Sequence, residues 1–288
     1  MARRKPATTH GVTVVDKPAG VTSHDVVGML RRRFGERQVG HAGTLDPDAT
    51  GVLVVAVGKA TRLLRFVEKT RKGYTGEVVL GTSTSTLDAA GEVLATFDMS
   101  EVTIDDARRE IADHLVGEIE QVPPMVSAIR VDGRRLHELA REGIEVERAP
   151  RPVTIHRFDV VGWSEPGILG IEVECSAGTY IRTLADDLGR LLGGGAHLRN
   201  LRRTHVGAFT IDEARAPDDC ELLPVASAVR SLARVVVDDD VAALVANGRV
   251  LDAWEGDGPW AVFDPADELL AVYEAFHDQA KPAVVLPR

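Results

Sequence analysis

The segment GHAGTLDPDATG, residues 40–51, places one histidine, two carboxylates and two hydroxyl groups close together in the sequence. Asp46 stands directly before Pro47, and a proline restricts the preceding residue to extended backbone conformations. A carboxylate that is held in one direction on a connecting segment suits covalent or acid–base chemistry. Taken alone, an ordinary polar turn explains these residues equally well.

The order LDPDAT also fits the DxDxT pattern of aspartyl-phosphate phosphotransferases. Asp46 would then be the nucleophile and Asp48 the acid/base, with Mg²⁺ bound between them. That motif normally follows an apolar strand, whereas VGHAGT is polar and rich in glycine. No later acidic pair completes a magnesium site, so the sequence favours a role for Asp46 other than phosphate transfer.

A second group of reactive side chains lies in CSAGTYIRTLA, residues 175–185. Tyr180 and Arg182 fall near the start of a predicted helix. An arginine close to Asp46 would keep that carboxylate ionised, because a nearby opposite charge favours the charged form. A tyrosine at such a place could stack on a planar ligand such as a base. From physical chemistry alone, a surface arginine and a core tyrosine are the simpler interpretations.

Composition sets the general class of the protein. The chain has 288 residues, 44% hydrophobic and 27% charged, which is typical of a globular protein and suggests about two domains. No apolar run approaches the roughly 18 residues of a membrane helix, and the basic N-terminal residues lack the apolar core of a secretory signal. Cys175 and Cys220 form no CxxC pair, which indicates reduced structural cysteines in a cytoplasmic protein. The nine histidines follow no zinc-binding spacing, so we expect no metal.

The net charge of −10 is unevenly distributed. Between Asp212 and Ala280 there are 16 acidic residues against 4 arginines, a net of −12, and the remainder carries +2. Basic runs lie at Arg31–Arg37, Arg62–Lys72 and Arg199–His205. Each run alone is typical of a solvated helix face. Together they are compatible with a polyanionic partner.

The hydrophobic pattern predicts the elements that position these residues. It predicts strands at 11–17, 51–58, 74–81, 125–131, 151–163 and 168–178, and helices at 23–34, 103–119, 133–143 and 179–193, the last ending at three glycines. Strands outnumber helices without regular βαβ alternation, which indicates an α+β fold with a mixed or antiparallel sheet. The tail is a small β-rich region, with a helix at 241–248 and strands at 260–264, 269–274 and 283–287.

Several blocks, taken in order, resemble the TruB family of bacterial tRNA pseudouridine synthases. The resemblance covers Gly11 to Phe209, about two thirds of the chain. VVDKPAGVTSHDVV is similar to the family's first motif, and VGHAGTLDPDATGVLVVAVGKATR to its catalytic motif. The blocks that follow are KGYTGEVVLGTSTSTLDAAGEV, QVPPMVSAIRVDGRRLHELAREGIEVE, SAGTYIRTLADDLG and AHLRNLRRTHVGAF. One block could arise by chance, whereas all of them in this order identify the family.

The resemblance implies the reaction of these enzymes, which isomerise uridine 55 in the T-arm loop of tRNA to pseudouridine. Asp46 would be the catalytic aspartate, and Arg182 would pair with it. The target base would be extruded from the folded loop before the carboxylate reaches it. Attack on C1′, attack on C6 and removal of a sugar proton are three open roles for Asp46.

The other implied site residues surround the target base. Tyr74 would contact the base inside the pocket, and Tyr180 would help to line that pocket. Leu201 would pack against it. His41 would help to take the uridine out of the stacked loop.

Two residues of the first motif, Lys17 and Pro18, would support the site. Asp48 would be a solvent-facing turn residue, because the family requires no acid at its position. His137 stands where the family pattern has a tyrosine, within a part that binds RNA rather than performs chemistry.

The resemblance also implies an architecture. A pseudouridine synthase catalytic domain would cover 1–210, with a mobile RNA-clasping insertion at about 123–152. A connecting segment would cover 211–234, and a small C-terminal domain, similar to an RNA-binding PUA domain but short and acidic, would cover 235–288.

Substrate and product of this reaction are isomers, so we expect no cofactor and no metal. The expected partner is the T-arm stem-loop of tRNA, bound by a cytoplasmic monomer without a membrane partner. The alternative function is a non-catalytic RNA-binding or tRNA-folding protein on the same scaffold. The combination of Asp46, Tyr74 and Arg182 argues against it, because binding alone does not require that aspartate.

Overall fold

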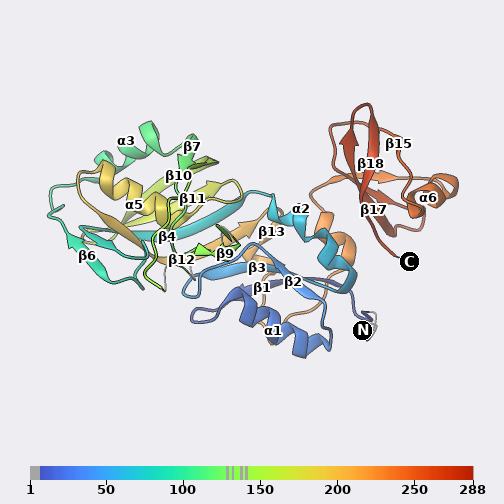
Figure 1. Ribbon diagram of the computed structural model, residues 1–288, viewed down its shortest axis with the longest axis horizontal. Helices are drawn as coiled ribbons and strands as arrows, with labels where there is room; N and C mark the ends of the chain where they lie inside the picture. The colour runs from blue at the N-terminus through green and yellow to red at the C-terminus, as the bar shows by residue number, and fades with distance from the viewer. Residues whose placement is uncertain (1–6, 128–129, 132, 137–138, 140–141, 288) are drawn as a thin grey trace. The chain divides into compact units, whose positions relative to one another are not determined.

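The computed structural model describes residues 7–127, 130–131, 133–136, 139 and 142–287, and its chain divides into two compact units (Figure 1). The first unit consists of Met1–Pro47, Gly51–Thr70 and Val206–Arg288, and the second of Asp48–Thr50 and Arg71–His205. The chain therefore leaves the first unit and returns to it. The domain boundaries expected at residues 210 and 235 stay predictions.

The first unit begins with antiparallel strands covered by a helix. Its elements up to residue 229 are β1 (Gly11–Lys17), α1 (Ser23–Phe34), β2 (Val39–Ala42), β3 (Thr50–Val57), η1 (Gly58–Leu63), α2 (Leu64–Glu68), β13 (Phe209–Thr210), η2 (Ile211–Glu213) and η3 (Val225–Val229). β1 and β2 both pair with β3 in the antiparallel sense.

Strand β3 is buried on both faces. Val52, Val54 and Ala56 belong to one hydrophobic cluster, and Leu53 and Val55 belong to another. This arrangement explains its uninterrupted apolar run, because neither face of the strand meets water. The predicted buried strand is confirmed.

Helix α1 covers one face of these strands. The Thr22 side chain accepts a hydrogen bond from the Asp25 N–H, and the Asp25 side chain accepts one from the Thr22 N–H, which forms a capping box. Gly35 ends the helix in the left-handed conformation, with φ of 62°. The apolar side of α1, including Val27 and Leu30, packs in the same cluster as Leu53.

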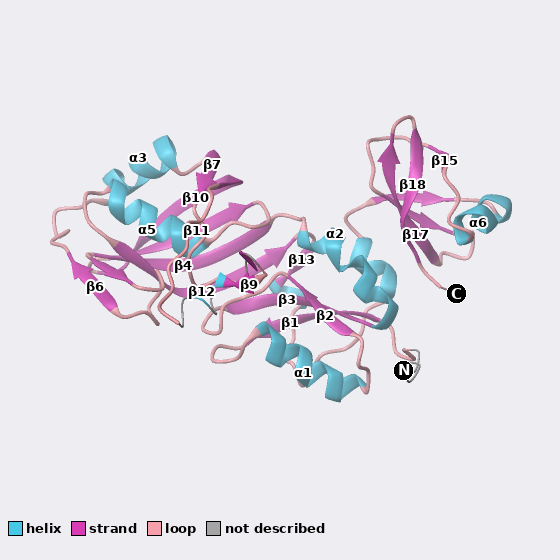
Figure 2. Ribbon diagram, viewed as in Figure 1, coloured by secondary structure: helices cyan, strands magenta, loops and turns pink. Residues whose placement is uncertain are grey.

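The C-terminal part of the first unit is a five-stranded sheet in the order β14-β16-β17-β18-β15, with one helix (Figure 2). Trp260 and Tyr273 are fully buried in its own hydrophobic cluster, and Trp254 packs edge-on against both. The predicted β-rich region is confirmed, with the elements β14 (Ala233–Val236), α6 (Asp239–Ala246), β15 (Leu251–Asp252), β16 (Trp260–Phe263), β17 (Leu269–Phe276) and β18 (Gln279–Val285).

The second unit is built on a sheet in the order β12-β4-β11-β10-β7. The pairs β4–β11, β11–β10 and β10–β7 are antiparallel, and helix α3 contacts both β10 and α5. The elements are β4 (Lys72–Leu80), β5 (Thr82–Thr84), β6 (Val93–Thr96), α3 (Ile104–His114), β7 (Gly117–Gln121), β8 (Arg130–Val131), β9 (Arg134–Arg135), β10 (Arg151–Glu165), β11 (Ile168–Cys175), α5 (Ile181–Leu191) and β12 (Ala196–Val206). Together the two units give the α+β fold with mixed and antiparallel sheets that the sequence predicts.

Several predictions for the second unit are wrong in detail. The helix predicted over 103–119 ends at His114, and Gly117, with φ of 95°, begins β7. The strand predicted over 125–131 is only β8. Of the helix predicted over 133–143, Arg134 and Arg135 form β9 instead, whereas Leu136 and Leu139 are helical. β12 has no counterpart in the prediction. His137 lies outside the described residues.

Two further sequence features were tested by the fold. Among the described residues, no helix is long and apolar enough to span a membrane. Cys175 and Cys220 are both buried, and burial raises the pKa of the Cys175 thiol to about 11. Such a thiol is protonated at neutral pH and has a structural rather than a chemical role.

Helix α5 contains a half-buried acid whose ionisation opposes folding. Burial and the neighbouring Asp186 charge raise the pKa of Asp187 from 3.8 to about 6, which favours the protonated form in the folded state. Stability from this group is present below about pH 4 and is lost as the pH rises through about 6. We therefore expect Asp187→Asn to raise the unfolding temperature at pH 7.5.

The measurement is thermal unfolding of both proteins over a pH series from about 4 to 8. The gain in unfolding temperature should shrink as the pH falls below about 6. Asp105→Asn, at a side chain that is 90% exposed on α3, serves as the control. A gain that does not change with pH would contradict the burial argument.

Candidate functional site

The residues on either side of Asp46 are fixed to neighbouring elements. Leu45 is buried, and its N–H and carbonyl are both hydrogen-bonded to the Ser23 hydroxyl at 2.9 and 3.1 Å. Ser23 is the first residue of α1, so the helix start determines where Leu45 lies.

The residue after Asp46 is held by a buried lysine. Lys17 is 0% exposed, and its Nζ donates to the carbonyl oxygens of Pro18, Val21 and Pro47 at 2.9, 2.7 and 2.9 Å. The Gly20 N–H donates to the same Pro47 carbonyl at 3.0 Å. The half-buried Asp46 is therefore bracketed by two anchored residues, and its backbone has little freedom.

The remaining predicted residues of the first unit lie around this segment. The Pro18 ring is exposed, and its contribution is the carbonyl that accepts from Lys17. His41 is half-buried on β2, opposite Val55 of β3. The loop within the GHAGTLDPDATG segment is shorter than expected, because β2 extends to Ala42 and β3 begins at Thr50. Asp48 is exposed, as expected for a turn residue.

Arg182 is buried in the second unit, so its interpretation as a surface helix residue is wrong. It is 4% exposed in the first turn of α5. Its Nη1 donates to the Thr86 carbonyl and its Nη2 to the Val126 carbonyl, both at 2.9 Å. A guanidinium is planar and rigid, so two such bonds fix its position and its orientation.

Asp88, a residue that the sequence did not reveal, approaches the same guanidinium. Its Oδ2 lies 3.5 Å from the Arg182 Nε. Its Oδ1 accepts from the Thr86 hydroxyl at 2.5 Å and from the Ala90 N–H at 3.1 Å. Leu87, between these residues, has a left-handed backbone with φ of 62°, which a leucine rarely adopts. The turn at 86–90 is therefore shaped around Arg182.

Tyr180 lies at the start of α5, as predicted, but immediately before its first residue rather than inside the helix, and it is half-buried rather than a full core residue. Its side chain does not cap the helix. Its main-chain N–H and carbonyl are both bound by the side chain of Gln121, which is 2% exposed at the end of β7. Gln121 is the second residue that the sequence did not reveal.

Tyr74 and Leu201 reach one region of the sheet. Tyr74 is buried on β4, two residues from Gly76 on the same strand face. A Cβ on Gly76 would lie 3.4 Å from Leu198 and 3.6 Å from Leu201. Leucines three apart in a regular strand point to opposite faces, and Asn200, with φ of 52°, shifts this alternation. The irregularity in β12 thus turns Leu201 towards the Tyr74 strand.

Hydrogen bonds connect these second-unit residues. The Leu198 N–H donates to the Leu87 carbonyl, and the Ala89 N–H donates to the Leu198 carbonyl, each at 3.0 Å. Through this bridge, the turn that binds Arg182 lies against the strand that carries Leu201. The second unit therefore brings Arg182 and Leu201 onto connected elements. Lys17 and Asp46 lie in the first unit. The pairing of Arg182 with Asp46 stays a prediction.

The third basic run, Arg199–His205, is less exposed and more involved in ion pairs than predicted. Arg203 is 1% exposed, and Arg199 forms ion pairs with Glu77 and Glu165 at 2.6 and 2.7 Å. Hydrogen bonds from Arg199 and Asn200, the Arg199 bond being the larger cause, hold the pKa of Glu77 below its ordinary value. The run belongs to strand β12, so a solvated helix face is wrong here.

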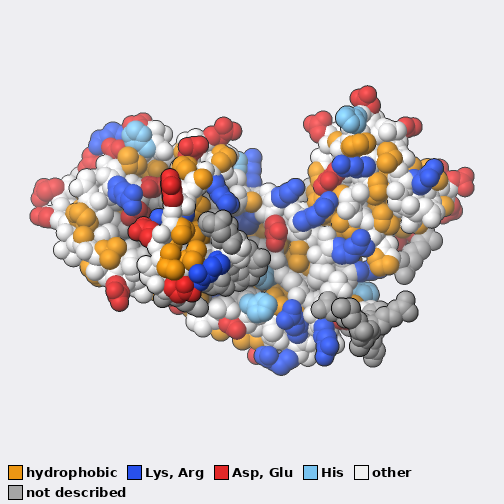
Figure 3. Space-filling model, viewed as in Figure 1, with side chains coloured by type: hydrophobic (Ala, Val, Ile, Leu, Met, Phe, Trp, Pro, Cys, Tyr) orange, Lys and Arg blue, Asp and Glu red, His pale blue; other side chains and the backbone are white. Residues whose placement is uncertain are grey.

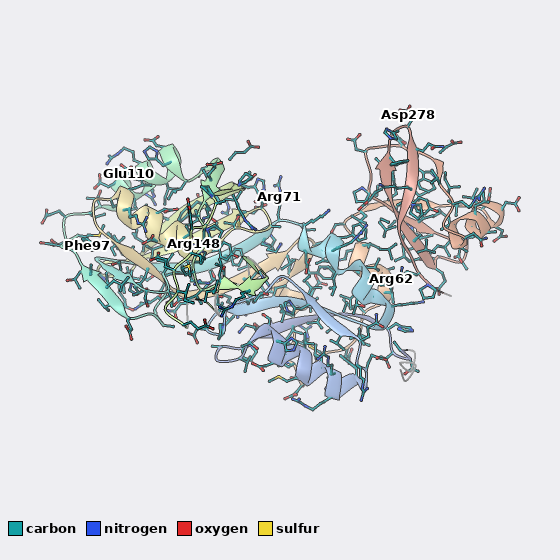
Figure 4. The ribbon with its side chains drawn as sticks, in the orientation of Figure 1. Arg62, Arg71, Phe97, Glu110, Arg148 and Asp278 are labelled. Carbon is teal, nitrogen blue, oxygen red and sulfur yellow. The ribbon has the colours of Figure 1, made fainter. Side chains whose placement is uncertain are left out.

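The other two basic runs retain exposed cations. In the second run Arg62, labelled in Figure 4, donates to the Val285 carbonyl, and Arg65 pairs with Glu274 at 3.0 Å. In the first run Arg32 and Arg37 have exposed side chains. Across the described part of the chain, no group of three or more histidine, cysteine or acidic side chains is arranged to hold a metal ion.

Family models match consecutive parts of the chain. The model described as "TruB family pseudouridylate synthase (N terminal domain)" matches residues 31–181. "tRNA pseudouridylate synthase B C-terminal domain" matches 182–237, and "tRNA Pseudouridine synthase II, C terminal" matches 232–287.

Known proteins are similar to the chain over nearly its whole length. The tRNA pseudouridine synthase B of Rhodococcus jostii is 45% identical, covering 99% of this chain and 97% of its own. That of an Arthrobacter species is 47% identical, covering 96% of each. A solved structure of a Cbf5–Nop10–Gar1 complex contains a chain that is 27% identical with a TM-score of 0.72, covering 96% of this chain and 84% of that one.

The Lys17 contacts predict a large effect of a neutral substitution. Lys17→Met retains the length of the side chain but leaves the carbonyls of Pro18, Val21 and Pro47 without this donor. We expect the free energy of unfolding to fall by about 1–3 kcal/mol, measured by urea denaturation. Lys69→Met, at an exposed lysine in the same unit, should leave it nearly unchanged. Equal stability of the two variants would contradict the anchoring role of Lys17.

Proposed function

The chain belongs to the TruB family of pseudouridylate synthases, and we propose that its substrate is uridine 55 in the T-arm loop of tRNA. Formation of pseudouridine in tRNA follows from 45% identity to a tRNA pseudouridine synthase B over nearly the full length of both chains. The choice of uridine 55 is supported by the ordered blocks from Gly11 to Phe209.

Pseudouridine formation sets two tasks for the protein. The N1–C1′ glycosidic bond breaks, the uracil turns, and a C5–C1′ bond forms. N1 gains a proton and C5 loses one, so the product is an isomer and no second reactant is consumed. The protein therefore has to supply a group that acts on the sugar or the base, and a pocket that keeps the detached uracil.

We assign the first task to Asp46. The observation that carries this assignment is the fixation of its two neighbours, Leu45 by Ser23 and Pro47 by Lys17. A carboxylate with a fixed backbone needs little reorganisation when the substrate arrives, which lowers the barrier to reaction. This property serves attack on C1′, attack on C6 and removal of a sugar proton equally.

We assign the second task to side chains of the second unit together with His41. Tyr74 and Leu201 offer an aromatic ring and an aliphatic surface suited to a flat base. Tyr180 lines the same pocket, and Arg182 pairs with Asp46 and keeps it ionised. Extrusion of the base costs a few kcal/mol, and His41 helps to take the uridine out of the stacked loop.

Removal of the Asp46 charge tests the proposal. Asp46→Asn keeps the size of the side chain but removes the carboxylate. We expect pseudouridine formation at uridine 55 of an unmodified tRNA transcript to fall by roughly 10⁴-fold or more, because an essential reacting group is lost. The affinity for tRNA should change by less than about threefold, since the folded surface is retained.

Asp48→Asn is the matched control, because the same substitution at an exposed residue should leave turnover unchanged. Full turnover by Asp46→Asn would remove the catalytic assignment. Wild-type protein that binds tRNA without forming pseudouridine would instead favour the alternative, a non-catalytic RNA-binding or tRNA-folding protein.

The exposed cations of the first basic run provide a separate test. If Arg32 and Arg37 contact phosphates, their replacement releases fewer counterions when tRNA binds. We expect the double variant Arg32→Gln/Arg37→Gln to bind tRNA more weakly at low salt. The slope of log affinity against log salt should fall by roughly 1–2, measured by filter binding.

Arg109→Gln is the control for this experiment, because Arg109 is paired with Asp106 at 2.6 Å on the acidic helix α3. A tRNA affinity that does not depend on salt would remove the electrostatic argument. An equal change in slope for the control would remove the assignment to Arg32 and Arg37.

A further inference from the structure

Gln121 lies at the end of β7, where this strand pairs with the start of β10. It is the last residue of β7 and pairs with Arg151, the first residue of β10. The chain between these residues, 122–150, leaves and returns to the sheet at this pair. Nearby, Arg148, labelled in Figure 4, donates to the Pro123 carbonyl at 3.0 Å. The backbone around Gln121 is therefore fixed by the sheet ladder on one side and by Arg148 on the other.

The Gln121 side chain binds the main chain of Tyr180 in the way that a neighbouring strand would. Its Oε1 accepts from the Tyr180 N–H at 3.0 Å, and its Nε2 donates to the Tyr180 carbonyl at 3.2 Å. Gln121 is 2% exposed, so water does not compete for these groups. A primary amide is the side-chain group that presents a donor and an acceptor side by side in this manner.

The loop that leads to Tyr180 is held at its other end by a different pair. The Ser176 hydroxyl accepts from the Thr154 N–H at 2.9 Å, and the Ser176 N–H donates to the Thr154 carbonyl at 2.8 Å. Thr154 lies on β10, whereas Gln121 lies on β7. Ser176 therefore positions the start of the loop, and Gln121 positions its end, where α5 begins.

The chain that follows Gln121 also contacts Arg182, which lies two residues after Tyr180. The Val126 carbonyl, five residues after Gln121, accepts from the Arg182 Nη2 at 2.9 Å. A shift of Tyr180 would move the first turn of α5, and with it the origin of the Arg182 side chain. The Gln121 amide binds both main-chain groups of Tyr180, the residue directly before this turn, and so helps to fix where the turn begins.

We infer that Gln121 is a positioning residue of the reaction, which sets the place of Tyr180 and Arg182 without touching the substrate. The inference rests on the proposed function, because it assumes that those two residues serve the reacting uridine. Gln121 thereby acts on the rate of the chemical step and leaves the binding of tRNA essentially unaffected.

Two substitutions separate positioning from folding. Gln121→Met retains the length and removes both hydrogen bonds. Gln121→Glu retains the shape but, when ionised, places a carboxylate oxygen against the Tyr180 carbonyl. The protonated acid can again donate to that carbonyl while its other oxygen accepts from the N–H, so only the glutamate variant can regain both contacts as the pH falls.

The measurements are the single-turnover rate of pseudouridine formation at uridine 55, the tRNA affinity and the unfolding temperature. We expect both variants to react at least about tenfold more slowly than wild type, with tRNA affinity within about twofold, because small misplacement of a reacting group costs rate. The rate of Gln121→Glu relative to wild type should rise between about pH 8 and pH 6, and that of Gln121→Met should not.

Ser176→Ala is the matched control, since it removes one hydrogen bond from the other end of the same loop. It should lower the unfolding temperature and leave the single-turnover rate near that of wild type. Three outcomes would overturn the positioning role and leave the proposed function intact. They are wild-type rates in both Gln121 variants, a loss of tRNA affinity as large as the loss of rate, and a rate of Gln121→Glu relative to wild type that does not change with pH. Absence of product from the wild-type protein would overturn the proposed function, and the positioning role with it.

Discussion

The local structure of the proposed site depends on the burial of two cations that are solvated by main-chain carbonyls. Lys17 is 0% exposed and Arg182 is 4% exposed. A buried cation without acceptors is strongly unfavourable, so carbonyl oxygens have to be brought to it. In the first unit this requirement fixes the segment that contains Asp46, because Pro47 supplies one of the carbonyls. In the second unit it fixes the start of α5 against the carbonyls of Thr86 and Val126.

Elements whose stability is determined within their own segment could be predicted from the sequence. The apolar run of β3 directly reflects burial on both faces, and α1 carries its own signals, Thr22 at its start and Gly35 at its end. β12 could not be predicted, because its arginines are balanced by acids that are distant in sequence. Arg199, for example, pairs with Glu77 and Glu165. A single sequence does not show these partners, so the run has the pattern of a solvated surface.

The site could be predicted as a set of residue identities but not as a set of contacts. Arg182 was named through the family blocks, although its local sequence favours a surface position. Its burial depends on acceptors 56 and 96 residues away in sequence. Asp88 and Gln121 were missed for the same reason. An aspartate before Ala-Ala-Gly is typical of a turn, and a glutamine before Val-Pro-Pro is typical of a loop, so their roles follow only from the groups that they bind.

The charge of the C-terminal part restricts how the chain can hold tRNA. Residues from Asp212 to Ala280 carry a net charge of −12, and acidic side chains are scattered over the visible face of the C-terminal sheet (Figure 3). Two arginines of this part already form ion pairs, Arg230 with Glu213 and Arg234 with Asp267. A phosphate backbone that followed this surface would be repelled. Electrostatic attraction therefore has to come from the rest of the chain, which carries a net charge of +2 and contains the three basic runs.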